Sequence, residues 1–147
     1  MYNKMLSIIL ISVLALFSYT TFAETNLSID KEALIGKPGD PSKISRTIKI
    51  TMLDNIFLPP EIVVNKGETI QFIFKNLGNN THQFLIGMED DLKKAANSKQ
   101  KNNNLIRVNP TEQKELIWHF TDEAVIPFAC PISTHFKTMR GQIIVKN

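Results

Sequence analysis

From residue 46 to the end of the chain, apolar and polar residues alternate with a period of two rather than 3.6. Successive side chains of a β-strand point to opposite faces, so this alternation predicts half-buried strands and not helices. Turn-forming residues interrupt it at 59–60, 65–67 and 76–80. The apolar positions that define the strands most clearly are Ile48, Ile50, Met52, Ile70, Phe72, Phe74, Leu116, Trp118, Phe120, Ile143 and Val145.

Seven to eight short strands at this spacing predict an all-β fold, a β-sandwich or Greek-key barrel of antiparallel strands. The composition is consistent with one packed core, since 43% of the 147 residues are hydrophobic and 21% are charged. The polar segment at residues 88–104 departs from the pattern. We expect a short helix there, at residues 90–96.

The beginning of the chain has the pattern of a secretory signal peptide. Lys4 precedes an apolar run at residues 5–17, and small residues at Thr21 and Ala23 precede Glu24. The run is shorter than the about 20 residues that span a bilayer. We therefore expect a signal peptide over residues 1–23 and an exported mature protein with no membrane span. The polar residues 24–45 predict an N-terminal arm with little regular structure, ahead of a domain at residues 46–147.

Charge and cysteine content exclude several classes of protein. Lys and Arg number 17 against 14 Asp and Glu, and no basic run is present, so nucleic-acid binding is not indicated. The one cysteine, Cys130, excludes an internal disulfide, a zinc ribbon and a CxxC redox motif. In an oxidising compartment an unpaired thiol is vulnerable to oxidation. It persists when it is deeply buried or when a ligand such as a metal occupies it.

Candidate metal ligands gather near the C-terminus. Cys130, His135 and Met139 have the spacing Cys-x4-His-x3-Met, just before the last expected strand at residues 140–146. A loop held at both ends by strands can bring a thiolate, an imidazole and a thioether to one point, and this donor set suits copper. His82 can supply a second imidazole, which completes a type 1 (blue) copper site. Each residue alone is more often ordinary packing or surface, but their combination favours ligation.

These motifs resemble those of cupredoxins, the superfamily of small exported copper proteins that includes plastocyanin and azurin. The resemblance covers residues 46–146 and is most specific at residues 82–87, which follow Asn76, and at residues 128–141. It implies a Greek-key β-sandwich of seven or eight strands that holds one copper ion. The implied equatorial ligands are His82, Cys130 and His135, and the implied axial ligand is Met139.

Within this superfamily, residues 46–50 with residues 36–40 upstream are similar to bacterial periplasmic cupredoxins of copper tolerance. Ser133 and Thr134 stand where such loops usually have Pro-Gly, and the x4/x3 spacing matches the azurin loop instead. Gln83 occupies the position of a polar residue that links the two ligand loops. The resemblance implies a periplasmic location.

Two functions agree with these features. One is a one-electron carrier for periplasmic redox partners; the other is a copper chaperone or sequestration protein for copper tolerance, which residues 46–50 favour. No orienting acid and no oxyanion-hole signature accompany Cys130, so we do not expect an enzyme. We expect a monomer whose partners are copper and periplasmic redox or copper-handling proteins. His119 alternates with buried neighbours and is expected at the surface, outside the site.

Overall fold

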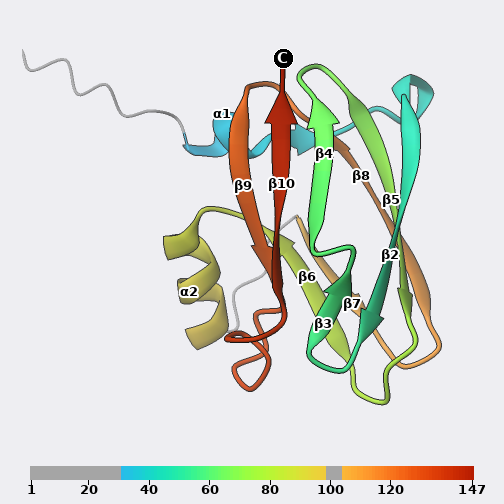
Figure 1. The fold of residues 1–147 in the computed structure, drawn as a ribbon, viewed down its shortest axis with the longest axis vertical. Helices are drawn as coiled ribbons and strands as arrows, with labels where there is room; N and C mark the ends of the chain where they lie inside the picture. The colour runs from blue at the N-terminus through green and yellow to red at the C-terminus, as the bar shows by residue number, and fades with distance from the viewer. Residues whose placement is uncertain (1–30, 99–103) are drawn as a thin grey trace, which may run out of the picture.

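The computed structural model describes residues 31–98 and 104–147. The expected signal peptide at residues 1–23 lies outside these residues. Two five-stranded sheets pack against each other (Figure 1). The first has the order β1-β8-β5-β2-β3, with bounds Lys37–Pro38, Gln113–His119, Thr69–Asn76, Arg46–Leu53 and Ile56–Leu58. The second has the order β4-β10-β9-β6-β7, with bounds Glu61–Asn65, Arg140–Lys146, Ala124–Ala129, His82–Ile86 and Leu105–Val108.

Strand direction differs in part from the sequence prediction of antiparallel strands. Most neighbours are antiparallel, but β2 pairs with β5 in parallel, as β4 does with β10. The chain leaves the first sheet at β4 and returns at β5, so β5 enters beside β2 in the same direction (Figure 1). Alternation of side chains records which face is buried and carries no information on the direction of a neighbour.

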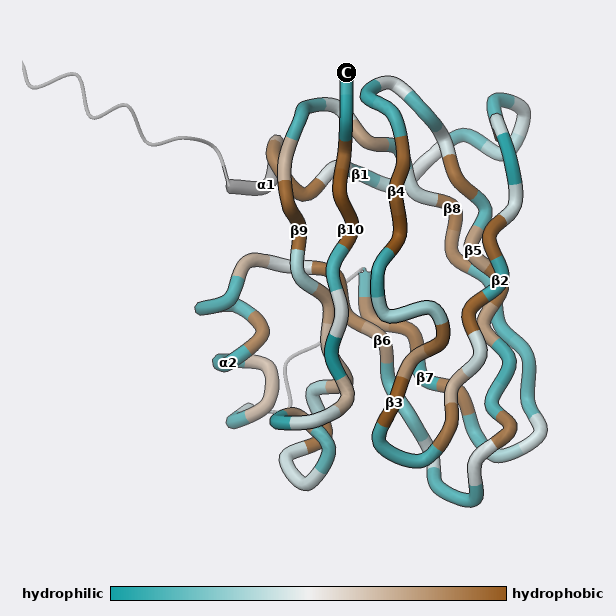
Figure 2. The backbone as a smooth tube through the Cα atoms, viewed as in Figure 1, coloured by the Kyte–Doolittle hydropathy of each residue, from teal (hydrophilic) through white to brown (hydrophobic). Residues whose placement is uncertain are grey.

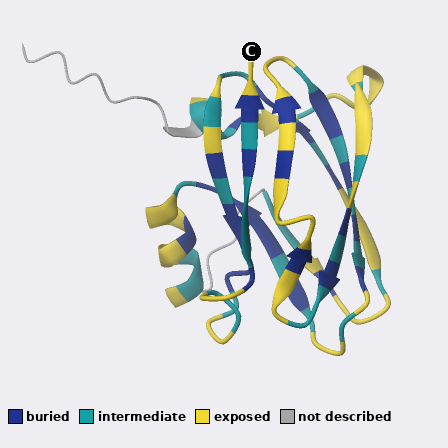
Figure 3. Cartoon of the chain, viewed as in Figure 1, coloured by how far each residue is buried: buried dark blue, intermediate teal, exposed yellow. Residues whose placement is uncertain are grey.

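The apolar faces of the strands meet between the sheets, as predicted. In Figure 2 brown and teal segments alternate along the strands, and in Figure 3 β4 alternates between buried and exposed. Phe84 lies at the centre of an aromatic cluster, with ring centroids 4.6 Å from Phe74, 4.8 Å from Phe128 and 5.5 Å from Phe57. Because His82 precedes Phe84 by two residues, its side chain faces the same interior. The aromatic core therefore supports the end of the sandwich where His82 lies.

The predicted helix is present as α2 (Glu89–Asn97) and packs on the outer face of the second sheet (Figure 1). Its buried residue Leu92 contacts Leu85 of β6 and Ala129 of β9. Among the described residues, no helix is both long and apolar enough to cross a bilayer.

The described part of the expected arm has more regular structure than its composition suggests. It contains α1 (Lys31–Ile35), the strand β1 that pairs with β8, and the 3-10 helix η1 (Pro41–Lys43). The Trp118 indole donates a hydrogen bond to the Ile35 carbonyl at 2.6 Å. Gly36 has φ of +86° and packs so closely that a Cβ would lie 2.4 Å from the His119 carbonyl oxygen. Pairing to the edge of β8 is a tertiary contact, which polar composition does not reveal.

Candidate metal centre

The loop before β6 places His82. Asn76, fully buried at the end of β5, ties this loop to the sheet. Its side-chain amide donates to the carbonyls of Asn80 at 2.8 Å and Val108 at 3.0 Å, and its carbonyl oxygen accepts from the Gly78 N–H at 2.9 Å. A satisfied buried amide of this kind holds a loop in one conformation. His82 itself is fully buried.

The loop at residues 130–139, between β9 and β10, places the other candidate ligands. It is closed at its base by a hydrogen bond from the Cys130 N–H to the Met139 carbonyl, at 2.9 Å. Inside the loop, the N–H groups of His135 and Phe136 donate to the Ile132 carbonyl at 2.8 and 2.9 Å, and the His135 carbonyl accepts from the Met139 N–H at 2.8 Å. Cys130 and Met139 are buried, whereas His135 is half-buried.

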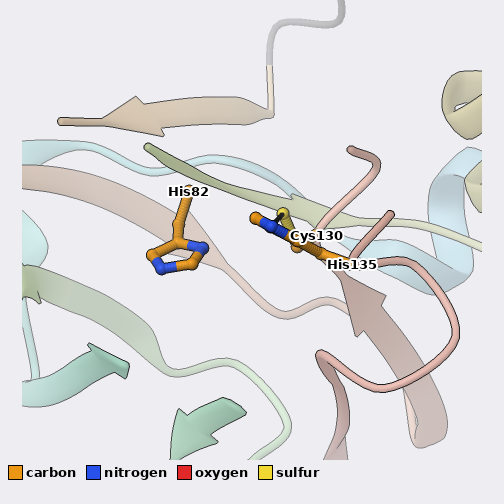
Figure 4. Close-up of side chains that lie close together, drawn as sticks. All are labelled: His82, Cys130 and His135. Carbon is orange, nitrogen blue, oxygen red and sulfur yellow. Dashed lines mark hydrogen bonds between the residues drawn. The ribbon is translucent and has the colours of Figure 1, made fainter. Parts of the chain in front are cut away.

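Three donor side chains converge at this end of the sandwich (Figure 4). The ligand atoms of His82, Cys130 and His135 all lie within 4.8 Å of one another. The Cys130 sulfur is 3.7 Å from His135 Nδ1, and the two imidazole centroids are 5.1 Å apart. Donors bound to one ion at about 2.0–2.3 Å lie roughly 3.5–4 Å apart in a trigonal arrangement. The cluster is therefore close to the size that a single ion requires.

One atom of this cluster has no hydrogen-bond partner in the described part of the chain. Among the described residues, His82 Nδ1 is the only buried side-chain nitrogen or oxygen without a hydrogen bond. In Figure 4 one ring nitrogen of His82 faces the other two side chains and the second points away from them. Buried polar atoms are normally satisfied. A metal ion between the three donors would satisfy this one, and the thiolate–imidazole set is one that copper prefers.

Behind His82 lies Asp54, in the turn between β2 and β3. Its Oδ1 is 3.1 Å from His82 Nε2. The carboxylate also accepts from the backbone N–H groups of Asn79, at 3.1 and 3.2 Å, and Asn80, at 3.2 Å. The Asn79 N–H above all, helped by the Asn80 N–H and by His82, lowers the pKa of Asp54 to about 2. Asp54 is thus a carboxylate at neutral pH, and a turn residue 28 positions from His82 gives no sequence signal of this contact.

Burial affects the pKa of two of the donors, His82 and Cys130. It lowers the pKa of His82, although Asp54 opposes the shift. It also raises the pKa of the Cys130 thiol, although the N–H groups of Ile132 and Gln83 oppose it. The imidazole is therefore neutral, as a ligand must be, and an incoming ion would displace the thiol proton.

The structure brings together the predicted residues His82, Cys130 and His135. Met139 belongs to the same buried cluster as Cys130. Gln83 contacts the second loop through its backbone N–H, which donates to the Cys130 sulfur at 3.4 Å. This contact does not use the polar side chain on which the prediction for Gln83 was based. His119 lies outside the cluster. It is half-buried rather than fully at the surface, since β1 pairs beside it and its Nδ1 lies 3.0 Å from Thr69 Oγ1.

A two-sheet sandwich with a His–Cys–His cluster at one end places the chain in the class of small β-sandwich proteins with a metal-binding site. The chain belongs to the cupredoxin-like family, because the family's model, a cupredoxin-like domain, matches residues 8–145. This confirms the resemblance inferred from the sequence.

Relatives and solved structures agree with this membership. A copper-resistant cuproprotein CopI of Rubrivivax gelatinosus is 31% identical over 99% of this chain and 100% of its own length. A protein of the same name from Pseudomonas aeruginosa is 28% identical over 76% of this chain and 82% of its own. In fold, the chain is similar to reduced auracyanin of Roseiflexus castenholzii, with a TM-score of 0.61 and 22% identity over 71% of this chain and 99% of that one.

Proposed function

We propose that this protein binds one copper ion through His82, Cys130 and His135, with Met139 as the axial ligand, and handles copper in the periplasm under copper stress. The observation that carries the proposal is the convergence of three donors on a buried point, where His82 Nδ1 has no hydrogen-bond partner among residues 31–98 and 104–147. The name shared by the relatives, copper-resistant cuproprotein, supports copper as the metal and resistance as the setting.

The candidate ligands differ in exposure, and this difference indicates the role of each. His82 and Cys130 are fully buried, and hydrogen bonds within each loop hold them in place. His135 is half-buried and is therefore the donor through which the site meets solvent or a partner. Copper, when bound, supplies a one-electron Cu(I)/Cu(II) couple. Donors held rigidly in one arrangement reduce the reorganisation that accompanies a change of oxidation state.

Electron transfer is the second candidate function, and the half-buried His135 favours it. A buried metal with one ligand near the surface has a short route for an electron. Growth separates the two functions: a deletion strain should be copper-sensitive if the protein handles copper, and should respire normally. Defective respiration without copper sensitivity would favour the carrier.

The organisation of the chain is also part of the proposal. Residues 1–23 would be removed on export, the segment at 24–45 would precede the domain, and the domain would comprise residues 46–147. N-terminal sequencing of protein from the periplasmic fraction tests this, with Glu24 expected as the first residue. An intact Met1 would contradict it.

Spectroscopy tests the site directly. The protein is titrated with stoichiometric Cu(II) and followed by optical absorption and EPR. An intense visible band with a small copper hyperfine splitting is expected, because a Cys thiolate bound to Cu(II) gives a type 1 centre. The Cys130→Ser variant should lose the band. An intense band that persists in this variant would remove Cys130 from the ligand set.

A further inference from the structure

Asp54 contacts the Nε2 edge of the His82 ring, which is turned away from Cys130 and His135. From this arrangement we infer that Asp54 is a positioning residue, which fixes His82 as an Nδ1 donor and favours Cu(II) over Cu(I) at the site. The inference rests on the proposed function, since it concerns how the same site is tuned.

The contact with Asp54 determines the tautomer of the His82 imidazole. A neutral imidazole carries one proton, on either Nδ1 or Nε2. Asp54 Oδ1 lies 3.1 Å from His82 Nε2 and can only accept, so the proton resides on Nε2. The lone pair is then on Nδ1, the atom that is buried without a hydrogen bond. A carboxylate–histidine pair of this kind sets the orientation of a metal-binding imidazole.

The Asp54 carboxylate is itself held in place by the loop before β6. The backbone N–H groups of Asn79 and Asn80 clamp its carboxylate at 3.1–3.2 Å. Gly78 makes room for this approach: a Cβ there would lie 2.5 Å from Asp54 Oδ1 and 3.0 Å from His82 Nε2. The loop that leads into His82 is thus shaped around the carboxylate, and two of its backbone N–H groups donate to the carboxylate oxygens.

The negative charge of Asp54 affects the two oxidation states of copper differently. A carboxylate one imidazole away from the ion makes that imidazole a stronger donor. Both this effect and the negative charge itself stabilise the doubly charged state more than the singly charged one. Asp54 therefore lowers the reduction potential of the site.

The test is Asp54→Asn, which preserves the size of the side chain and an acceptor oxygen but removes the charge. The matched control is Asp122→Asn. Asp122 lies in the β8–β9 loop, at the end of the sandwich opposite the 130–139 loop (Figure 1), and its carboxylate pairs with the Lys66 ammonium at 3.1 Å. Competition with chelators gives the Cu(II) and Cu(I) affinities of both variants, and redox titration gives their potentials.

Removal of the charge should weaken Cu(II) binding about 10–100-fold and Cu(I) binding much less. The potential should rise by about 59 mV for each tenfold change in the ratio of the two affinities. Asp122→Asn should match the wild type. Equal losses of both affinities, with an unchanged potential, would mean that Asp54 only supports the loop, and would overturn the inference.

A measurement on the copper-free wild type needs neither the variant nor the metal. Long-range ¹H–¹⁵N NMR at neutral pH should show His82 protonated at Nε2 and not at Nδ1. Protonation at Nδ1 would overturn the positioning role, even if Asp54→Asn fails to fold. If the wild type binds no copper in either oxidation state, the proposed function fails, and the NMR result still decides what Asp54 does to His82.

Discussion

Gly78 lies in the loop before β6, where a side chain would meet both Asp54 and His82. A Cβ at this position would be 2.5 Å from Asp54 Oδ1, 3.0 Å from the Asp54 backbone nitrogen and 3.0 Å from His82 Nε2. Ordinary contacts are about 3.5 Å, so Gly78→Ala requires the carboxylate to move by about 1 Å. That displacement lengthens the hydrogen bond of 3.1 Å to His82 beyond effective range.

The cost of the change in stability should be modest. Crowding a packed site costs about 1–3 kcal/mol, and the lower end applies because neighbouring Leu77 and Asn79 are exposed and the loop can yield. At roughly 4–8 °C per kcal/mol for a domain of this size, the melting temperature should fall by about 4–8 °C. Copper binding should suffer more: loss of the His82 partner predicts a Cu(II) affinity about 10–100-fold weaker.

The matched control is Gly87→Ala, at the other end of β6. A Cβ there would be 3.6 Å from the Leu92 side chain, which is ordinary contact. Thermal melts followed by circular dichroism and chelator competition for Cu(II) compare the two variants. Gly87→Ala should resemble the wild type in both. If Gly78→Ala also resembles the wild type in melting temperature and Cu(II) affinity, the close packing of this loop on Asp54 and His82 has no consequence for the site, and the prediction is wrong.

Three other predictions concern the axial ligand, stability at acid pH and support of the ligand loop. Met139→Leu keeps the side-chain volume but removes the thioether, so the potential should rise while copper is retained; an unchanged potential and spectrum would exclude Met139 as a ligand. Burial raises the pKa of Glu68, but hydrogen bonds from Arg46 and the Asn65 N–H outweigh it and leave the pKa below 4.5. The ionised Glu68 side chain therefore stabilises the fold above that pH by about 1 kcal/mol. In thermal melts at pH 7 the wild type should be more stable than Glu68→Gln, and this difference should disappear as the pH falls through the lowered pKa of Glu68. A wild type that is still more stable than the variant at pH 2 would contradict this. Phe136 packs beneath Arg140, 4.7 Å from ring centroid to guanidinium carbon, so Phe136→Ala should loosen the 130–139 loop and speed copper release to a chelator in stopped flow, whereas an unchanged rate would show that the loop holds itself.

Much of the fold could be predicted because its signal is local. Alternation assigns Ile70, Phe72 and Phe74 to the interior without any knowledge of their neighbours, and all three are fully buried. The short helix was also predictable, since a polar segment that starts with acidic residues suits a helix on the surface. The parallel pairing of β2 with β5 was not, because it depends on where the chain returns after crossing to the other sheet.

The same distinction holds for the candidate metal centre. Cys130 and His135 lie in one short loop, and His82 begins a strand with a distinctive sequence, so the convergence of these three donors could be predicted from the sequence. The partner of His82 was decided only by the tertiary structure. Asp54 reaches it because two turns from different parts of the chain meet at the same end of the sandwich, and the backbone N–H groups of one bind the carboxylate of the other. Such a contact follows from the parallel pairing of β2 with β5, which brings the ends of both strands to the same edge of one sheet, and no spacing of residues along the chain reveals it.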